Sequence, residues 1–307
     1  MTSRLRLEAT PVLDIGGTHV TAARVANGTV IEQHRGPLDA EADASAIISQ
    51  IATIASALTG RPPGSRWGVA IPGPFDYVRG VGDFSSVEKF QSLRGFDVGA
   101  ALCTVLPGRP DRVAFVNDAE AYALGEWDVR GRPERLMCIT LGTGVGSGFI
   151  AGGALITAGP EVPVDGNIHT EQWDGRPLER TVSREAIRRT FAAARGGTAD
   201  VEEITRLARA GDECAGRVLR EAMVVLGNVL ARWVGRFCPD AVVVGGSMSR
   251  SWDVLSPGLL AGLAQSNVHG PHPSPAQLVD TAPLVGAAII AIRTTNQLAT
   301  GTEGGLR

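Results

Sequence analysis

The chain has 307 residues, of which 44% are hydrophobic and 20% charged, as in globular proteins, and it is long enough for two domains. Its formal net charge is −3, from 29 basic and 32 acidic residues, which favours neither a nucleic acid nor a membrane surface as partner. Its four cysteines include no CxxC pair, and residues 1–10 lack the apolar segment of a signal peptide. We therefore expect a cytoplasmic protein without nucleic-acid or membrane partners.

Short β-branched runs alternate with helical stretches along the chain, which predicts an α/β fold. The chain opens with a strand, a glycine turn, a strand, an Asn27-Gly28 turn and a strand, and a similar succession recurs after residue 135. This repeat indicates two α/β domains, formed by residues 1–117 with a C-terminal helix at about 285–307, and by residues 118–284. Strands are expected at 11–15, 20–25, 29–34, 67–71, 112–116, 136–141, 147–150 and 241–245, and helices at 43–59, 118–128, 183–194, 199–209, 212–236, 252–265 and 285–297. A surface loop is expected at 266–275, before a final strand and the last helix.

The first glycine turn lies in "DIGGTH". Gly16 and Gly17 let backbone N–H groups converge on an anion, and the Thr18 hydroxyl adds a donor. An acid directly before such a turn repels phosphate unless a metal ion intervenes, so Asp14 is a candidate partner of Mg²⁺ or its bound water. The alternative is a plain hairpin turn with a solvated Asp14.

The second turn, "GTGVG", has the same build around Thr143 and Gly144 but no preceding acid. Neither turn matches a Walker or a dinucleotide-binding pattern, because no lysine follows and the next element is a strand. Two such turns could hold the phosphates of one nucleotide. A strand ending in Gly245-Gly246-Ser247 has room for adenine against its backbone, although a simple strand-to-helix turn explains it equally well.

Asn117 and Asp118 stand where an apolar strand ends and a helix begins. Either residue could simply cap the helix. Alternatively, Asp118 is a general base that accepts a hydroxyl proton, and Asn117 orients the hydroxyl. The helix dipole would favour the ionised form of Asp118.

Five ordered segments, "LDIGGTHV", "AIPGPFD", "VNDAEAYALGE", "LGTGVGSGFI" and "VVVGGSMS", resemble the ROK family of sugar kinases, its glucokinase-like members most of all. The resemblance covers nearly the whole chain. It implies two ribonuclease-H-like domains of the actin-like ATPase superfamily with a cleft between them, and the use of ATP and Mg²⁺. It also implies that Asp14 to Thr18 and Gly142 to Gly144 bind phosphate, that Gly245 and Gly246 border the adenosine, that Asp118 is the base and that Asn117 holds the sugar.

The resemblance implies further sugar-binding residues. In "VDGNIHTEQWDGRPLERTVSR", Asn167 stands for a family glutamate, His169 for a family histidine and Glu179 for a later glutamate. Gly73 lies in "AIPGPFD", and Glu88 and Lys89 lie where the family supplies a sugar-facing loop, although a solvated charged pair explains them as well.

The chain also departs from the family. The zinc-binding cysteine cluster of many members is missing, so no structural zinc is expected. Packing of Trp173 and Leu178 is expected to order the loop that zinc orders in those members. The common "GGTK" lysine is replaced by His19.

The resemblance therefore implies a homodimeric, ATP-dependent kinase of the 6-hydroxyl of a hexose. The acceptor is glucose or a glucose-like amino sugar such as kanosamine, whose ammonium would need a carboxylate such as Glu179 or Glu171. Polyphosphate stays open as a donor. The alternative, a sugar-binding transcriptional regulator of the same family, is disfavoured because only 13 residues precede Asp14.

Overall fold

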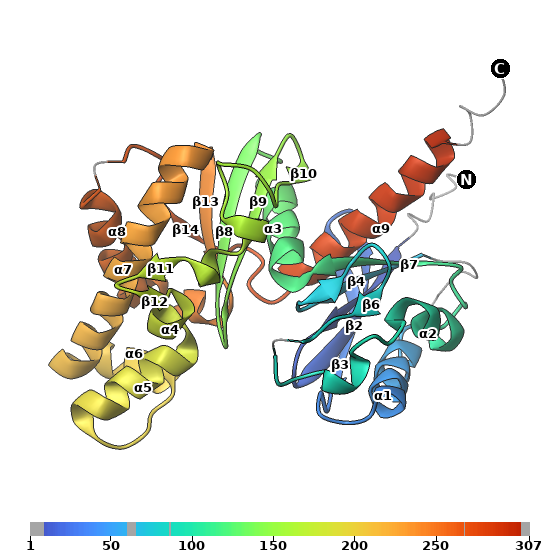
Figure 1. Ribbon diagram of the computed structural model, residues 1–307, viewed down its shortest axis with the longest axis horizontal. Coiled ribbons are helices and arrows are strands. Elements are labelled where there is room, and N and C mark those ends of the chain that lie inside the picture. Colours follow the sequence, from blue (N-terminus) through green and yellow to red (C-terminus); the bar gives the residue numbers. More distant parts are fainter. Residues whose placement is uncertain (1–8, 60–65, 86, 267, 302–307) are drawn as a thin grey trace, which may run out of the picture. The chain divides into compact units, whose positions relative to one another are not determined.

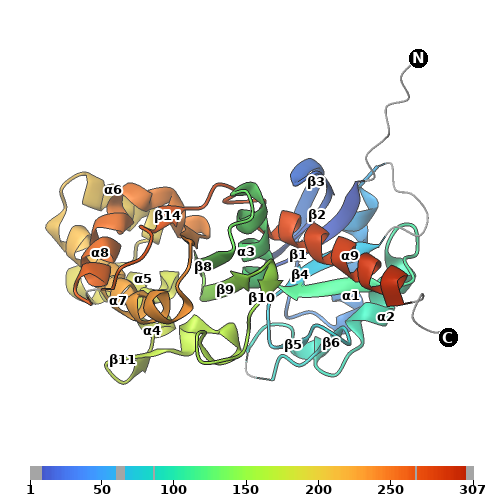
Figure 2. The same cartoon turned by 90° about the horizontal axis from the view of Figure 1, so that it is seen from above.

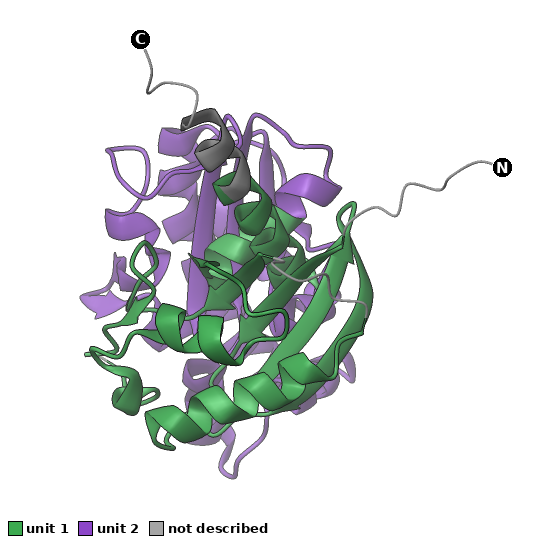
Figure 3. Cartoon of the chain, turned by 90° about the vertical axis from the view of Figure 1, so that its right-hand side faces the viewer, with its two compact units in different colours: residues 1–125, 281–307 green, residues 126–280 purple. Residues whose placement is uncertain are grey.

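A computed structural model describes residues 9–59, 66–85, 87–266 and 268–301. The chain divides into two compact units, shown in Figure 3. Unit 1 is Met1–Gly125 with Thr281–Arg307, and unit 2 is Glu126–Asp280. The first division falls inside helix α3 (Asp118–Val129), so the start of this helix belongs to unit 1.

The sheet of unit 1 has the strand order β3-β2-β1-β4-β7 (Figures 1 and 2). β1, β2 and β3 form an antiparallel meander, whereas β1, β4 and β7 are parallel neighbours. Asn27 and Gly28 both have positive φ, 49° and 71°, as the predicted two-residue hairpin turn requires. The strands are β1 (Thr10–Ile15), β2 (His19–Ala26), β3 (Thr29–Pro37), β4 (Trp67–Ile71) and β7 (Val113–Asn117), with a separate small hairpin of β5 (Phe75–Asp76) and β6 (Val81–Gly82).

Helices cover both faces of this sheet. α1 (Ala44–Ser56) contacts β2 and β3, and its buried Ile47, Ile48 and Ile51 share a core cluster with Val69 of β4. α9 (Ala282–Gly301) contacts β1, β4 and β7 from the other face. It approaches closely because a glycine lies at the contact: a Cβ atom at Gly68 would stand 2.0 Å from the carbonyl oxygen of Ala287. The remaining helices are α2 (Val98–Val105), the first turns of α3, and the short 3₁₀ helix η1 (Gln91–Leu93).

Unit 2 repeats the same strand scheme, with the order β10-β9-β8-β13-β14. β8 and β9 form the predicted antiparallel hairpin, and β13 is the parallel neighbour of β8. The two units therefore place a glycine turn in the same position, between the first two strands of each sheet. The strands are β8 (Arg135–Leu141), β9 (Val145–Ala151), β10 (Ala154–Leu155), β13 (Ala241–Gly245) and β14 (Ser274–Pro275), with a separate hairpin of β11 (Gln172–Trp173) and β12 (Arg176–Pro177).

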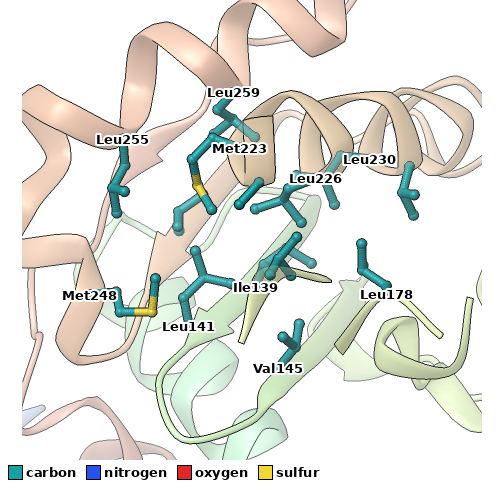
Figure 4. Packing of buried hydrophobic residues seen from close by; sticks show 14 of the residues in the cluster. Ile139, Leu141, Val145, Leu178, Met223, Leu226, Leu230, Met248, Leu255 and Leu259 are labelled. Atoms are coloured by element: carbon teal, nitrogen blue, oxygen red, sulfur yellow. The ribbon is translucent and has the colours of Figure 1, made fainter. Parts of the chain in front are cut away.

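The core of unit 2 forms around the long helix α7 (Glu213–Phe237), and Figure 4 shows Leu226 and Leu230 of this helix above Ile139 of β8. α8 packs closely against α7, since a Cβ atom at Gly262 would stand 2.2 Å from the carbonyl oxygen of Val224. None of the described helices is long and apolar enough to cross a membrane. The helices are α4 (Glu179–Val182), α5 (Arg184–Arg195), α6 (Val201–Arg209), α7 and α8 (Trp252–Ala264), with the 3₁₀ helices η2 (Val164–Gly166), η3 (Ile168–Thr170) and η4 (Ser247–Ser251).

Every strand and helix for which limits were expected occurs, with limits that differ by a few residues. The final strand expected between the loop at 266–275 and the last helix does not occur there. The shorter elements were missed, among them α2, α4 and the two-residue strands. The predicted loop at 266–275 contains one of these strands, β14, because Ser274 and Pro275 pair with β13 at the sheet edge. Such elements are too short for a periodic pattern, and their pairing partners lie far away in the sequence.

A buried carboxylate ties α3 to the segment before α9. Glu126 is 0% exposed. Its oxygens accept hydrogen bonds from the backbone amides of Gln277 at 3.0 Å and Leu278 at 2.6 Å, and from Arg130 Nε at 3.0 Å. Because a buried ion is stable only when paired and hydrogen-bonded, these three donors account for a charge at this place.

Glu126→Ala is expected to lower the free energy of unfolding by about 3 kcal/mol or more, because it leaves Arg130 Nε and two backbone amides without their acceptor. Urea denaturation of the variant and the wild type measures this. Glu185→Ala is the control: Glu185 is 65% exposed and pairs with Arg188 on the surface of α5, so a change below about 1 kcal/mol is expected. Equal effects of the two substitutions would contradict the role given to Glu126.

Candidate active site

The candidate residues of unit 1 gather at one edge of its sheet. β1, β4 and β7 are parallel, and their registers align Asp14 with Ala70 and Ile71 with Asn117. The chain leaving the carboxyl end of each strand therefore meets the others at this edge, which is the usual ligand-binding edge of parallel sheets. β1 supplies Asp14 and the turn after it, β4 is followed by Gly73, and β7 ends in Asn117 and Asp118.

The first glycine turn closes the β1–β2 hairpin. The Gly16 amide donates to the His19 carbonyl oxygen at 2.9 Å, and the Thr18 carbonyl accepts from the Leu38 amide at 2.9 Å. In the part of the chain that the structure describes, no group accepts a hydrogen bond from the amides of Gly17 and Thr18. Two neighbouring amide donors are thus available to an anion, as expected from the sequence.

Asp14 stands two residues before this turn and lies near a second carboxylate, Asp118. Burial and the neighbouring Asp118 carboxylate raise its pKa to about 7, against the opposing effect of the Arg35 guanidinium. Arg35 reaches it across the sheet, since Asp14 and Arg35 both pair with Thr21. A divalent cation fits this place, because it would relieve the repulsion between two carboxylates.

Asp118 is the first residue of α3. Its Oδ1 accepts a hydrogen bond from the Ala119 amide at 2.9 Å. The helix start was expected to favour the ionised form, yet burial outweighs the backbone hydrogen bonds and raises the pKa of Asp118 above its ordinary value. A raised pKa makes the carboxylate a stronger base whenever it is ionised.

Asn117 caps α3, so the simpler of the two expectations for this residue is realised. Its Oδ1 accepts hydrogen bonds from the amides of Ala119 at 3.0 Å and Glu120 at 3.3 Å. Its Nδ2 donates to the Tyr77 hydroxyl at 3.0 Å, and this hydroxyl donates to the Ile71 carbonyl at 3.3 Å. The cap uses the oxygen of Asn117 and leaves one Nδ2 hydrogen for a ligand.

Tyr77 and Glu120 belong to this group but were missed in the sequence. Burial raises the pKa of Glu120 to about 7, and the Asp118 carboxylate adds to the shift. Burial also raises the pKa of the Tyr77 hydroxyl. Gly73 borders the same group: a Cβ atom there would lie 3.1 Å from the Tyr77 hydroxyl oxygen and 3.9 Å from Asn117 Nδ2. Tyr77 directly follows the "GPFD" segment, which was the available signal.

Glu88 and Lys89, the two candidate residues of the β6–η1 loop, behave differently. The Lys89 side chain lies against the first glycine turn, where a Cβ atom at Gly17 would stand 2.6 Å from Lys89 Nζ. Glu88 is exposed and makes no ion pair with any described residue. Only Lys89 of this pair therefore lies against the first glycine turn.

The second glycine turn, in unit 2, is held by the segment at the start of α4 and α5. The Gly142 amide donates to the Gly144 carbonyl at 3.0 Å, and the Gly142 carbonyl accepts from the Arg184 amide at 3.0 Å. Glu179 Oε1 accepts from the Val145 amide at 3.1 Å, and a Cβ atom at Gly144 would meet this oxygen at 2.6 Å. Thr143 is exposed at the tip of the turn.

The glycine pair Gly245-Gly246 at the end of β13 lies beside this turn. Gly246 has φ 77°, and a Cβ atom on it would stand 2.4 Å from the Leu141 carbonyl oxygen at the end of β8. A Cβ atom at Gly142 would lie 3.8 Å from the Ser247 hydroxyl oxygen. Gly245 pairs with Thr140 in the parallel register, so the expected adenosine segment and the second turn share one edge of the sheet.

The loop with Asn167 and His169 is anchored on β9. The buried Ser147 hydroxyl accepts from the Ile168 amide at 3.0 Å and donates to the Gly166 carbonyl at 2.5 Å. Asn167 is exposed and His169 is half-buried, and within the described residues neither side chain forms a hydrogen bond or ion pair.

Around this loop one packing expectation is confirmed and one is wrong. Leu178 is fully buried, as expected, whereas Trp173 is 37% exposed because it lies on the projecting β11–β12 hairpin. Ser147 supplies the anchoring that was assigned to Trp173. Glu171 is paired with Arg232 of α7 at 2.8 Å. Within the described residues no group of three or more histidine, cysteine or acidic side chains is placed to hold a metal ion.

A family model described as ROK family matches residues 11–294. The chain belongs to the ROK family. Curated ROK relatives include a glucokinase of Thermotoga maritima, 26% identical over 79% of this chain and 83% of that protein. They also include a kanosamine kinase of Amycolatopsis mediterranei, 27% identical over 91% of this chain and 94% of that protein. An N-acetylmannosamine kinase of Escherichia coli O139:H28 is 30% identical over 78% of this chain and 83% of that protein.

Solved ROK structures have the same fold. The ROK hexokinase from Thermus thermophilus matches with a TM-score of 0.76 and 26% identity, covering 94% of this chain and 99% of that chain. A ROK family glucokinase from Streptomyces griseus, crystallised with glucose and AMPPNP, matches with a TM-score of 0.75 and 24% identity, covering 93% of this chain and 99% of that chain. The predicted α/β fold of the actin-like ATPase superfamily is thereby confirmed.

Proposed function

We propose that this ROK protein is an ATP- and Mg²⁺-dependent hexose kinase that phosphorylates the 6-hydroxyl of glucose or of a glucose-like amino sugar. The observation that carries this proposal is the group in unit 1: a half-buried Asp118 beside Asp14 and a turn with two available amide donors. The family membership and the kinase names of the curated relatives support it.

In the proposed reaction the Asp118 carboxylate accepts the proton of the sugar hydroxyl as the hydroxyl oxygen attacks the γ-phosphorus. The new O–P bond forms while the bond from phosphorus to the ADP oxygen breaks. The amides of Gly17 and Thr18 donate to the transferring phosphoryl oxygens, and Asn117 orients the hydroxyl with its remaining Nδ2 hydrogen. Asp14 would hold Mg²⁺, which supplies positive charge to the phosphate oxygens.

In unit 2 we assign nucleotide phosphates to the turn at Thr143 and Gly144, and adenosine to Gly245, Gly246 and Ser247. Asn167, His169 and Glu179 stay proposed sugar contacts on the family resemblance alone. Of the two carboxylates considered for an amino-sugar ammonium, Glu171 already pairs with Arg232. Glu179 engages the Val145 amide through Oε1.

A coupled assay of ADP release with MgATP tests the proposal against glucose, mannose, N-acetylmannosamine, fructose and kanosamine. We expect sugar-dependent ADP release with glucose or kanosamine, loss of activity when Mg²⁺ is chelated, and a phosphorylated 6-position by NMR of the product. Polyphosphate in place of ATP identifies the donor. No sugar-dependent turnover with any acceptor or donor would contradict the kinase proposal.

Tyr77→Phe is expected to lower kcat/KM for the sugar about fivefold to tenfold, because Asn117 Nδ2 loses an acceptor that fixes its direction. The ring stays, so the aromatic contact with Phe75 and the unfolding free energy should change little. Steady-state kinetics with varied sugar and fixed MgATP measure the effect. Unchanged sugar kinetics would remove Tyr77 from the positioning of Asn117.

A further inference from the structure

The chain contains a single lysine. Lys89 is the only lysine among 29 basic residues, and all the others are arginines. It lies in the loop between β6 and η1, next to Phe90, whose ring is 1% exposed and packs on Phe84 at 5.2 Å. The Phe90 amide donates to the Ala40 carbonyl at 2.8 Å, so the backbone beside Lys89 is fixed.

The side chain of Lys89 turns toward the first glycine turn. A Cβ atom at Gly17 would lie 2.6 Å from both Cδ and Nζ of Lys89, so the lysine stem occupies the space that the missing side chain of Gly17 leaves. Within the described residues no carboxylate lies within ion-pair distance of the Lys89 ammonium. Many arginines, in contrast, are held in ion pairs, such as Arg184 with Asp200 and Arg209 with Asp253.

The Lys89 ammonium therefore lies beside a turn whose Gly17 and Thr18 amides have no acceptor among the described residues. A positive point charge beside two backbone N–H groups is a typical arrangement for binding a phosphate oxygen. A neutral sugar hydroxyl gains much less from an unpaired ammonium, and no described acceptor competes for it.

We propose that Lys89 binds the terminal phosphate of the phosphoryl donor at the turn Gly16–Thr18, and that it does not bind the sugar. This inference rests on the proposed kinase function. In this proposal the Lys89 ammonium, supplied by the β6–η1 loop, neutralises negative charge on the phosphoryl group that is transferred.

The single lysine permits a direct chemical test that does not depend on turnover. Pyridoxal 5′-phosphate carries an aldehyde and a phosphate; its aldehyde carbon forms an imine with Lys89 Nζ, releasing water, and borohydride reduces that imine to a stable secondary amine. We expect one label at Lys89 by peptide mass spectrometry, prevented by MgATP or inorganic triphosphate but not by sugar. Pyridoxal, which lacks the phosphate, should label Lys89 at least tenfold more slowly.

The N-terminal amine is the internal reference in the same sample. Labelling of Lys89 that is no faster than labelling of this amine, or that triphosphate does not prevent, would overturn the proposal. Labelling with protection in a protein that phosphorylates no sugar would uphold the phosphate site and contradict only the proposed kinase function.

Kinetics of Lys89→Met separate phosphate binding from sugar binding. We expect kcat/KM for MgATP to fall about 100-fold, with the KM for sugar within about twofold of the wild type and partial recovery in Lys89→Arg. Arg94→Met is the matched control, since Arg94 is an exposed cation a few residues further along the same segment. A raised KM for sugar with unchanged MgATP kinetics would overturn the proposal.

Discussion

Asp118→Asn is expected to reduce kcat by about 1000-fold, because the amide cannot accept the proton of the attacking hydroxyl. The KM for sugar should stay within a few-fold, since Asn117 and Tyr77 are untouched. Asparagine keeps the oxygen that accepts from the Ala119 amide and removes a half-buried charge, so the variant should be at least as stable as the wild type. Steady-state kinetics and urea denaturation of the same preparation measure both effects.

Asp128→Asn is the matched control for this experiment. It lies at the other end of α3, where it pairs with Arg132 at the surface, and kcat should remain within about twofold. A kcat for Asp118→Asn within tenfold of the wild type would exclude Asp118 as the base, whatever the control shows.

Asp14→Asn has its largest expected effect on the pH dependence of stability. The pKa of Asp14 is raised from 3.8 to about 7 in the folded protein, so the folded state binds this proton more tightly than the unfolded state does. The stability that this proton contributes is complete below pH 4 and is lost as the pH rises through 7. Without metal, the wild type should therefore lose about 2.5 kcal/mol between pH 5 and pH 8 through this group alone.

The Asp14→Asn variant should lack this loss, and urea denaturation of both proteins at pH 5 and pH 8 in EDTA gives the difference directly. Mg²⁺ with nucleotide should stabilise the wild type at pH 8 more than the variant, and the variant should be nearly inactive. A wild type and variant with parallel pH profiles would show that Asp14 is not held in a repulsive carboxylate pair.

The strands and their turns could be predicted because their signals are local. Asp14 with its glycines, and Asn117 with Asp118, stand where an apolar run stops, and parallel strands bring such positions to one edge. The alternation of apolar and polar residues predicts where each strand lies, and it therefore also predicts which residues stand at the strand ends.

The contributions of loops could not be predicted in the same way. Tyr77 joins Asn117 from 40 residues away, and Lys89 reaches Gly17 from a loop without any period of its own. Glu120 lies one turn inside α3, where the sequence indicates an ordinary helix-start acid. In each case the contact is set by tertiary packing, here by the cluster of Phe75, Phe84 and Phe90. The prediction that Trp173 packs in this loop was wrong because it relied on the size of the side chain. The residue lies on the projecting β11–β12 hairpin and is 37% exposed.

The close packing of α9 on unit 1 has a consequence for the order in which the protein forms. α9 fills one face of the β1–β4–β7 sheet, and a Cβ atom at Gly286 would stand 1.8 Å from the Ala121 carbonyl oxygen of α3. Yet all of unit 2, which includes the last residues of α3, is synthesised before α9. On the ribosome, unit 2 can therefore complete its core while the sheet of unit 1 still waits for its covering helix, so the group around Asp118 is finished last.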